Sequence, residues 1–156
     1  MGAVDIVWID TNIIIYFLRA NRDFTPSVKI VIDQANAGMY TLKVTPVVIG
    51  ECVYVLMGKN FNIKKTDVAT SLISFINMKG VEMEEKDVVE KALNQFAKKG
   101  VDYADAYIAE HAKAMMPPSI LSVNVKDFMK LGISVYTPTE LMSTNESQDN
   151  GDDKNP

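Results

Sequence analysis

The sequence has very few residues of the kinds that hold soft metals or form covalent cross-links. Cys52 is the single cysteine and His111 the single histidine in a chain of 156 residues. One cysteine excludes an internal disulfide framework and a multi-cysteine zinc site, and one histidine excludes a centre built from several imidazoles. We therefore expect oxygen ligands for any bound metal, a buried structural role for Cys52, and a surface or helix-packing role for His111.

Long apolar runs are also missing. The run from Ile13 to Leu18 is as long as any and is far shorter than the ~20 residues that a membrane-spanning helix needs. No basic stretch followed by a signal-like apolar core opens the chain, so we expect a cytoplasmic protein with no membrane partner. The formal net charge of -4 argues against binding nucleic acid mainly through a large basic surface. Part of this acidity lies in residues 144–156, which leaves the remaining body close to neutral.

Short apolar segments alternate with longer amphipathic ones along the chain. The short segments are rich in β-branched residues, which is typical of buried strands. The longer ones repeat apolar residues at three- and four-residue spacing, which is typical of helices packed on a core. Strands are expected at 3–9, 40–44, 119–123 and 133–136, and helices at 11–20, 25–38, 46–58, 63–78, 86–98 and 102–114.

Threonine followed by proline marks three helix starts in the same way. These are Thr25-Pro26, Thr45-Pro46 and Thr137-Pro138, and Glu140 completes a capping box at the third. Threonine is a good N-cap, and proline is preformed for the first helical position. We therefore predict that each threonine caps the helix that follows it.

Alternating strands and helices imply right-handed crossovers and a mainly parallel sheet covered on both faces. We predict an α/β domain, three-layer α/β/α with a mainly parallel central sheet, over residues 1–143. Residues 144–156 are polar and acidic and cannot bury enough apolar area to order themselves, so we predict a disordered C-terminal tail.

Two carboxylates stand out in the first third of the chain. Asp10 follows the first predicted strand, and strand carboxyl ends face the ligand crevice in open α/β sheets, but Asp10 can equally cap the helix beginning at Thr11. Glu51 is the one charged residue between Pro46 and Gly58. Uncompensated burial would raise its pKa or cost several kcal/mol, so we expect a cation, a metal or an exposed crevice edge beside it. A lysine salt bridge or a plain surface stripe is the alternative.

Two further pairs of polar residues occur later in the chain. Asp102 and Asp105 are three residues apart and so share a face near a helix N-terminus, where Asp102 is alternatively the N-cap. Asn124 and Asp127 follow a predicted strand as Asp10 does. They are candidates for a further oxygen ligand, and either can instead cap the short helix that leads to Met129.

Four segments carry these residues in order: IDTNIII, TPVVIGECVYVL, VDYADAYIAEHA and LSVNVKDFMKLGISVYTP. Together they resemble the PIN-domain family, particularly the small VapC-type toxins of prokaryotic toxin-antitoxin pairs. The resemblance covers residues 4–142. It implies a PIN-like fold, an acidic cluster that binds Mg²⁺ or Mn²⁺, and endonucleolytic cleavage of RNA.

The resemblance implies catalytic and metal-binding roles for Asp10, Glu51 and Asp105, with Asp102 at a position where the family's acid is more variable. Asn124 stands where many members carry a fourth aspartate, and Asp127 lies three residues beyond it. Both are candidate metal ligands. Asparagine offers a carbonyl oxygen without negative charge, so a second metal is expected to bind more weakly.

The resemblance also implies partners: an RNA substrate, a second copy in a homodimer, and a small antitoxin protein that enters the acidic cleft. A bound metal would make the site locally positive in an otherwise acidic protein. Candidates for phosphate contact are Lys43, Lys59, Lys64, Lys65, Lys98, Lys99, Lys126 and Lys130.

Other enzyme classes fit less well. A phosphatase of the haloacid-dehalogenase type needs a second aspartate where Asn12 lies, and a response-regulator receiver needs paired acids at its first strand end. The main alternative to a nuclease is a catalytically weak PIN-like module that binds RNA or a protein.

Overall fold

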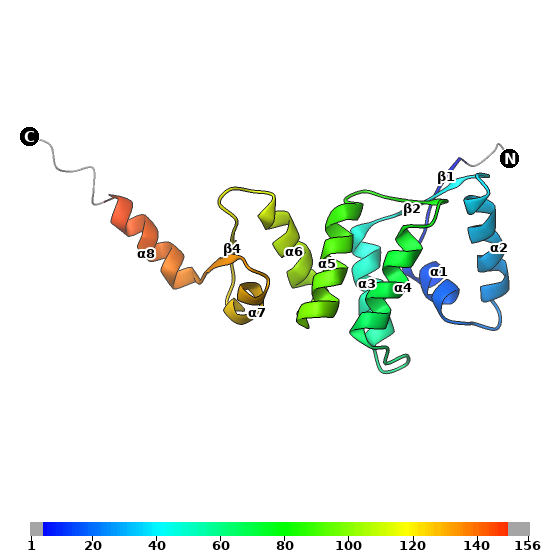
Figure 1. The fold of residues 1–156 in the computed structure, drawn as a ribbon, viewed down its shortest axis with the longest axis horizontal. Coiled ribbons are helices and arrows are strands. Elements are labelled where there is room, and N and C mark those ends of the chain that lie inside the picture. The colour runs from blue at the N-terminus through cyan, green and yellow to red at the C-terminus, as the bar shows by residue number, and fades with distance from the viewer. Residues whose placement is uncertain (1–4, 150–156) are drawn as a thin grey trace, which may run out of the picture.

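The computed structural model describes residues 5–149. Within that range the chain forms eight helices and five strands (Figure 1). Their bounds are β1 Ile6–Trp8, α1 Thr11–Leu18, α2 Thr25–Asn36, β2 Thr41–Val44, α3 Pro46–Met57, α4 Lys65–Ile76, β3 Val81–Met83, α5 Lys86–Lys99, α6 Tyr103–Lys113, β4 Ser119–Leu121, α7 Val125–Lys130, β5 Ser134–Tyr136 and α8 Pro138–Asp149. No helix among these residues is long and apolar enough to cross a membrane.

All strand pairs are parallel, which confirms the predicted α/β fold with a parallel sheet flanked by helices. β1, β2 and β3 form one sheet in that order, with Ile6 opposite Thr41 and Leu42 opposite Val81. β4 and β5 form a separate two-stranded sheet. One central sheet was predicted from the sequence, and β3 was not predicted, because a three-residue strand beside several glutamates carries little apolar pattern.

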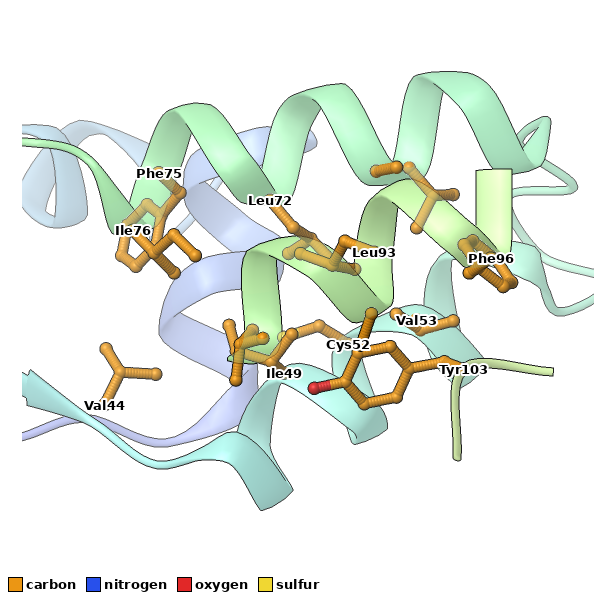
Figure 2. Close-up of a cluster of buried hydrophobic side chains, with 14 of the residues drawn as sticks. Val44, Ile49, Cys52, Val53, Leu72, Phe75, Ile76, Leu93, Phe96 and Tyr103 are labelled. Atoms are coloured by element: carbon orange, nitrogen blue, oxygen red, sulfur yellow. The ribbon is translucent and has the colours of Figure 1, made fainter. Parts of the chain in front are cut away.

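The largest buried cluster lies where α3, α4 and α5 meet (Figure 2). The helices contribute one apolar face each, which is why apolar residues recur at three- and four-residue spacing. Tyr103, the first residue of α6, also reaches this cluster, and a Cβ on Gly50 of α3 would lie 3.3 Å from the Tyr103 ring. The absence of a side chain at Gly50 therefore lets α6 approach α3 closely. Prominent members of the cluster are Ile49, Cys52, Leu72, Phe75, Ile76, Leu93 and Phe96.

The molecule is elongated (Figure 1). The three-stranded sheet lies near one end with α1 and α2, and helices α3 to α6 follow across the middle. β4 and α7 lie beyond α6, and α8 projects from the other end. Two parts of the α/β fold are thus separated by a layer of helices.

Two of the three predicted threonine caps are confirmed. The Thr45 hydroxyl accepts a hydrogen bond from the backbone N–H of Val48, and Thr137 and Glu140 form the expected capping box. The prediction for Thr25 was wrong: Phe24 is the cap residue, and the Thr25 hydroxyl donates to the Tyr16 carbonyl oxygen at 2.7 Å. That hydroxyl fastens α2 to α1 instead.

The chain's C-terminal end continues further as a helix than expected. The boundary placed at residue 144 falls inside α8, because this helix runs to Asp149. Residues 150–156 of the expected disordered tail lie outside the described range.

Gly80 fixes β3 against α2. Its N–H donates to the side-chain oxygen of Asn36 at 2.9 Å, and its carbonyl accepts from the N–H of Leu42. A Cβ at this position would lie 2.3 Å from the carbonyl carbon of Ala35, far inside van der Waals contact. The close approach of the two backbones therefore requires glycine.

Candidate active site

Asp10 and Glu51 are linked through Thr11, and we call these three residues the first acidic group. Asp10 Oδ1 accepts a hydrogen bond of 2.7 Å from the Thr11 N–H, so the aspartate does cap α1. The Thr11 hydroxyl then donates to Glu51 Oε2 at 2.8 Å. Thr11 is buried while both carboxylates are exposed. A buried neutral donor therefore orients an exposed carboxylate contributed by a different helix.

Glu51, the one charged residue of an apolar helix, lies on the exposed side of α3. The buried residues of α3 are Ile49, Cys52, Val53 and Leu56, which leaves Glu51 on the exposed side of the helix. The alternative of a lysine salt bridge is wrong: within residues 5–149, Glu51 makes no ion pair. The Glu51 side chain is therefore exposed and has no cationic partner among the described residues.

The pKa of the Cys52 thiol is affected by the two carboxylates of the first acidic group. The thiol is buried, and burial, followed by the negative charges of Glu51 and Asp10, raises its pKa to about 12. The predicted structural role of Cys52 is confirmed by this burial. The two carboxylates that raise the pKa lie near enough to each other to act on one sulfur atom.

Asp105, Asn124 and Asp127 form the second acidic group. The Asn124 amide donates to Asp105 Oδ2 at 2.9 Å and to Asp127 Oδ2 at 3.1 Å. Asp127 also pairs with Lys130 at 3.4 Å. Asn124 stands at the N-cap position of α7 but its side chain makes no cap bond, so the capping alternative is wrong for Asn124. Its amide holds two carboxylates together.

The surroundings of the second group shift both of its carboxylates. Burial raises the pKa of Asp105, the hydrogen bond from Asn124 opposes that rise, and the charges of Asp102 and Asp127 add to it. The pKa of Asp127 is lowered, chiefly by the hydrogen bond from Asn124 and also by Lys130. Asp102 is exposed at the N-cap position of α6 and makes no side-chain cap bond. It acts on Asp105 through its charge.

The two groups are separate in the described part of the chain. No hydrogen bond among residues 5–149 joins Asp10 or Glu51 to Asp105, Asn124 or Asp127. No three histidine, cysteine, aspartate or glutamate side chains in that range lie close enough together to hold a metal ion. The donors are of the oxygen type that Mg²⁺ and Mn²⁺ favour. Their chemistry fits such an ion, but the arrangement within one chain does not complete a site.

Sequence reasoning missed the two neutral donors' roles. Thr11 was considered only as the first residue of the helix after Asp10, and Asn124 only as a ligand or cap. The threonine directly after a strand-end aspartate was a signal available in the sequence. The contact with Glu51 was not, because it joins residues forty positions apart in the chain.

His111 lies away from both groups. Its Nε2 is 3.4 Å from a Glu85 carboxylate oxygen, and its ring packs edge-on against Tyr107, 4.7 Å between centroids. Tyr107 donates a hydrogen bond to the same Glu85. The predicted helix-packing role of His111 is confirmed.

An apolar groove of about 1010 Å³ lies between α3 and α6. Val47, Tyr54 and Ile108 contribute exposed apolar surface to it. Of the candidate acids, only Asp102 lines the groove. The groove is therefore a feature distinct from the two acidic groups.

Comparison with known families identifies the class of protein. The family model described as PIN domain matches residues 7–120, well over half of the chain, and the chain belongs to the PIN-domain family. The match runs from β1 to β4 and includes Asp10, Glu51, Asp102 and Asp105, while Asn124 and Asp127 lie beyond it. PIN-domain proteins are typically nucleases that use divalent metals. No curated protein matches the chain.

Proposed function

We propose that this protein is a metal-dependent endoribonuclease that cleaves RNA phosphodiester bonds. The observation that carries the proposal is the way the carboxylates are held. Within the described residues, Glu51 and Asp105 are each oriented by a neutral donor, Thr11 and Asn124 respectively, and neither forms an ion pair with a cation. Carboxylates kept free of lysine and arginine are available to bind a metal cation.

The ligands we propose for Mg²⁺ or Mn²⁺ are carboxylates supported by an amide oxygen. Asp10, Glu51 and Asp105 form the core, with Asp102 adding charge and Asn124 or Asp127 completing the donors. A bound divalent ion supplies charge stabilisation for phosphoryl oxygens and lowers the pKa of an attacking water. The residues of the chain position the ion and the RNA.

Several of the lysines that were candidates for a phosphate contact are already paired with other groups. Lys130 pairs with Asp127, and Lys43 with Glu82 at 2.8 Å. The Lys65 ammonium donates to the carbonyl oxygens of Gly100 and Val101. These three lysines already have partners, so Lys126, which lies two residues after Asn124 and is exposed, is the better candidate for a phosphate contact.

The experiment is cleavage of RNAs of several sequences by the purified full chain with Mg²⁺, with Mn²⁺ and with a chelator. Asp10→Asn, Glu51→Gln and Asp105→Asn should each reduce cleavage by at least about 100-fold. Asp33→Asn, an exposed aspartate of α2, is the matched control and should cleave as the wild type does. RNA binding without cleavage under every metal condition would favour the alternative, a catalytically weak PIN-like binding module.

We further propose, on the resemblance to VapC-type proteins, that the chain is the toxin of a toxin-antitoxin pair, with a small antitoxin protein as its partner. Expression of the wild type should then arrest growth, and expression of Asp105→Asn should not. The mass of any small protein that copurifies with the chain would identify the partner. Growth unaffected by an active nuclease would instead indicate RNA processing.

A further inference from the structure

Two strand edges in the structure are unpaired and apolar. β1 is the end strand of the three-stranded sheet, and β4 is an end strand of the two-stranded sheet. On β1, Ile6 and Trp8 are 54% and 60% exposed; on β4, Leu121 is 57% exposed, and Val123 just beyond it is 84% exposed. Parallel strands are normally buried on both faces, and an exposed edge with apolar side chains is a template for further strand pairing.

The other two sheet edges have neighbours. β3 packs against α4, and β5 packs against α7 and α8. β1 has its main contacts with β2, and β4 with β5 and α6. Since β4 also contacts a helix, what sets β1 and β4 apart among the described strands is the exposed apolar side chains Ile6, Trp8 and Leu121.

The β4 strand of the same chain is not placed to pair with β1. α6 packs extensively on α5, and Tyr103 at its start is seated in the core beside Cys52 and Val53 (Figure 2). β4 and α7 pack in turn on α6, and they lie beyond it from β1 (Figure 1). Pairing within one chain would require β4 and α7 to give up their packing on α6, whereas a second copy can supply β4 with these contacts intact.

We propose that two copies of this chain exchange their C-terminal segments, so that β4 of each copy pairs in parallel with β1 of the other. Each resulting sheet has the order β3-β2-β1-β4-β5, with β4 and β5 contributed by the second copy. A reciprocal exchange closes the dimer and leaves neither edge open. The elongated shape of the single chain is the shape such an exchange requires.

The exchange also joins the two acidic groups, a consequence that rests on the proposed function. Asp10 follows the carboxyl end of β1, and Asn124 follows the carboxyl end of β4. Parallel pairing places these two ends side by side, at the point of the sheet where connections diverge and ligands bind. Asp105 and Asp127 accompany Asn124 through its hydrogen bonds. Each metal site then takes its first group from one copy and its second group from the other.

The assembly is tested by the molar mass of the full chain in solution, measured by light scattering. The wild type should be a dimer. Val123→Lys places a charge at the proposed junction without disturbing the chain's own core and should give a monomer. The matched control is Val47→Lys on α3, a similarly exposed valine at 79%, which should leave the dimer intact. A monomeric wild type, or a dimer broken by Val47→Lys and kept by Val123→Lys, would overturn the proposal.

The shared site is tested with Asp10→Asn and Asp105→Asn chains. The two variants are unfolded, mixed in equal amounts and refolded together. Homodimers of either variant have a defect in every site, whereas a mixed dimer has one intact site and one doubly altered site. With random pairing, about a quarter of the sites are intact. Mn²⁺ binding and RNA cleavage should both recover to that fraction.

The outcomes separate the two proposals. A dimer whose mixture recovers Mn²⁺ binding without cleaving RNA would refute the nuclease function and keep the shared site. Cleavage by a monomer, or no recovery of Mn²⁺ binding in the mixture although wild-type chains bind Mn²⁺, would refute the shared site and keep the nuclease function.

Discussion

The Thr11 hydroxyl, buried at the start of α1, donates a hydrogen bond of 2.8 Å to the Glu51 carboxylate on α3. The N–H of the same residue is held by Asp10. One threonine thus fixes the relative positions of two carboxylates from distant parts of the chain. Groups that orient metal ligands in this way commonly affect metal affinity as strongly as some ligands do.

Replacing Thr11 with valine should therefore weaken Mn²⁺ binding about tenfold while the fold is kept. Valine has nearly the same shape, and the exposed Glu51 can regain water, so unfolding should become easier by less than about 1 kcal/mol. Thr11→Ser keeps the hydroxyl and is the control. Calorimetric titration with Mn²⁺ measures the effect, and equal affinities for the valine and serine variants would contradict the orienting role.

Replacing Asn124 with aspartate restores a fourth acid but removes the donor that holds Asp105 and Asp127 together. Three carboxylates would then repel one another, and the pKa of Asp105, already raised mainly by burial, should rise further. A carboxyl group whose pKa is higher in the folded than in the unfolded state stabilises the fold at a pH below its unfolded-state pKa. That stabilisation is lost as the pH rises through the folded-state pKa. The metal-free variant should accordingly melt roughly 3–6 °C below the wild type at neutral pH and close to it near pH 3.

The same variant should gain more from metal. An added carboxylate strengthens cation binding, and binding to the folded state raises stability. The melting temperature of Asn124→Asp should rise more than that of the wild type when Mn²⁺ is added. A smaller rise would indicate that Asn124 does not lie at the metal site.

Cys52 should be inert in the folded protein. Its pKa of about 12 leaves almost no thiolate at pH 8, so iodoacetamide should label the native chain at least about 100-fold more slowly than the chain in urea. The folded-state pKa lies above the ordinary value of 9.0. The free energy of unfolding should therefore be unaffected below pH 9 and fall as the pH rises toward 12. The fall should be smaller in Cys52→Ala, where the tyrosines with raised pKa values, Tyr103 and Tyr107, still contribute to it. Rapid labelling of native protein would show that the thiol is accessible.

Gly80→Ala should destabilise the protein severely, by about 3 kcal/mol or more, because the new Cβ meets the backbone of Ala35. Gly38→Ala is the matched control. Gly38 has a φ of +87° with open space around it, so alanine there meets conformational strain alone and should cost only about 1 kcal/mol. Urea unfolding of both variants gives the comparison, and similar losses would show that α2 and β3 separate easily.

Elements with a strong local pattern were predictable from the sequence. The helices of the core were expected from their apolar spacing, and Thr45 and the Thr137–Glu140 box were expected from cap chemistry. Thr25 looked the same locally, yet its hydroxyl bonds to the Tyr16 carbonyl. Tertiary contact decided between two partners that the sequence cannot rank.

The candidate site was predictable in its residues and not in its grouping. Asp10 stood out because it follows a predicted strand, and Glu51 because it is the one charged residue in an otherwise apolar helix. Which donors meet depends on how the strands assemble, and strand order is a non-local property. β3 and the division into two sheets escaped prediction for the same reason.

Because the metal-binding donors are divided between two sheets, the activity proposed for the dimer depends on the protein concentration. If a complete site needs two chains, a cell holding few molecules contains mostly single chains without activity, and nuclease output rises with the square of the protein concentration until dimers dominate. A modest increase in synthesis would then produce a much larger increase in RNA turnover. Pairing at the edge of β1 would thus make nuclease activity depend on the number of copies present.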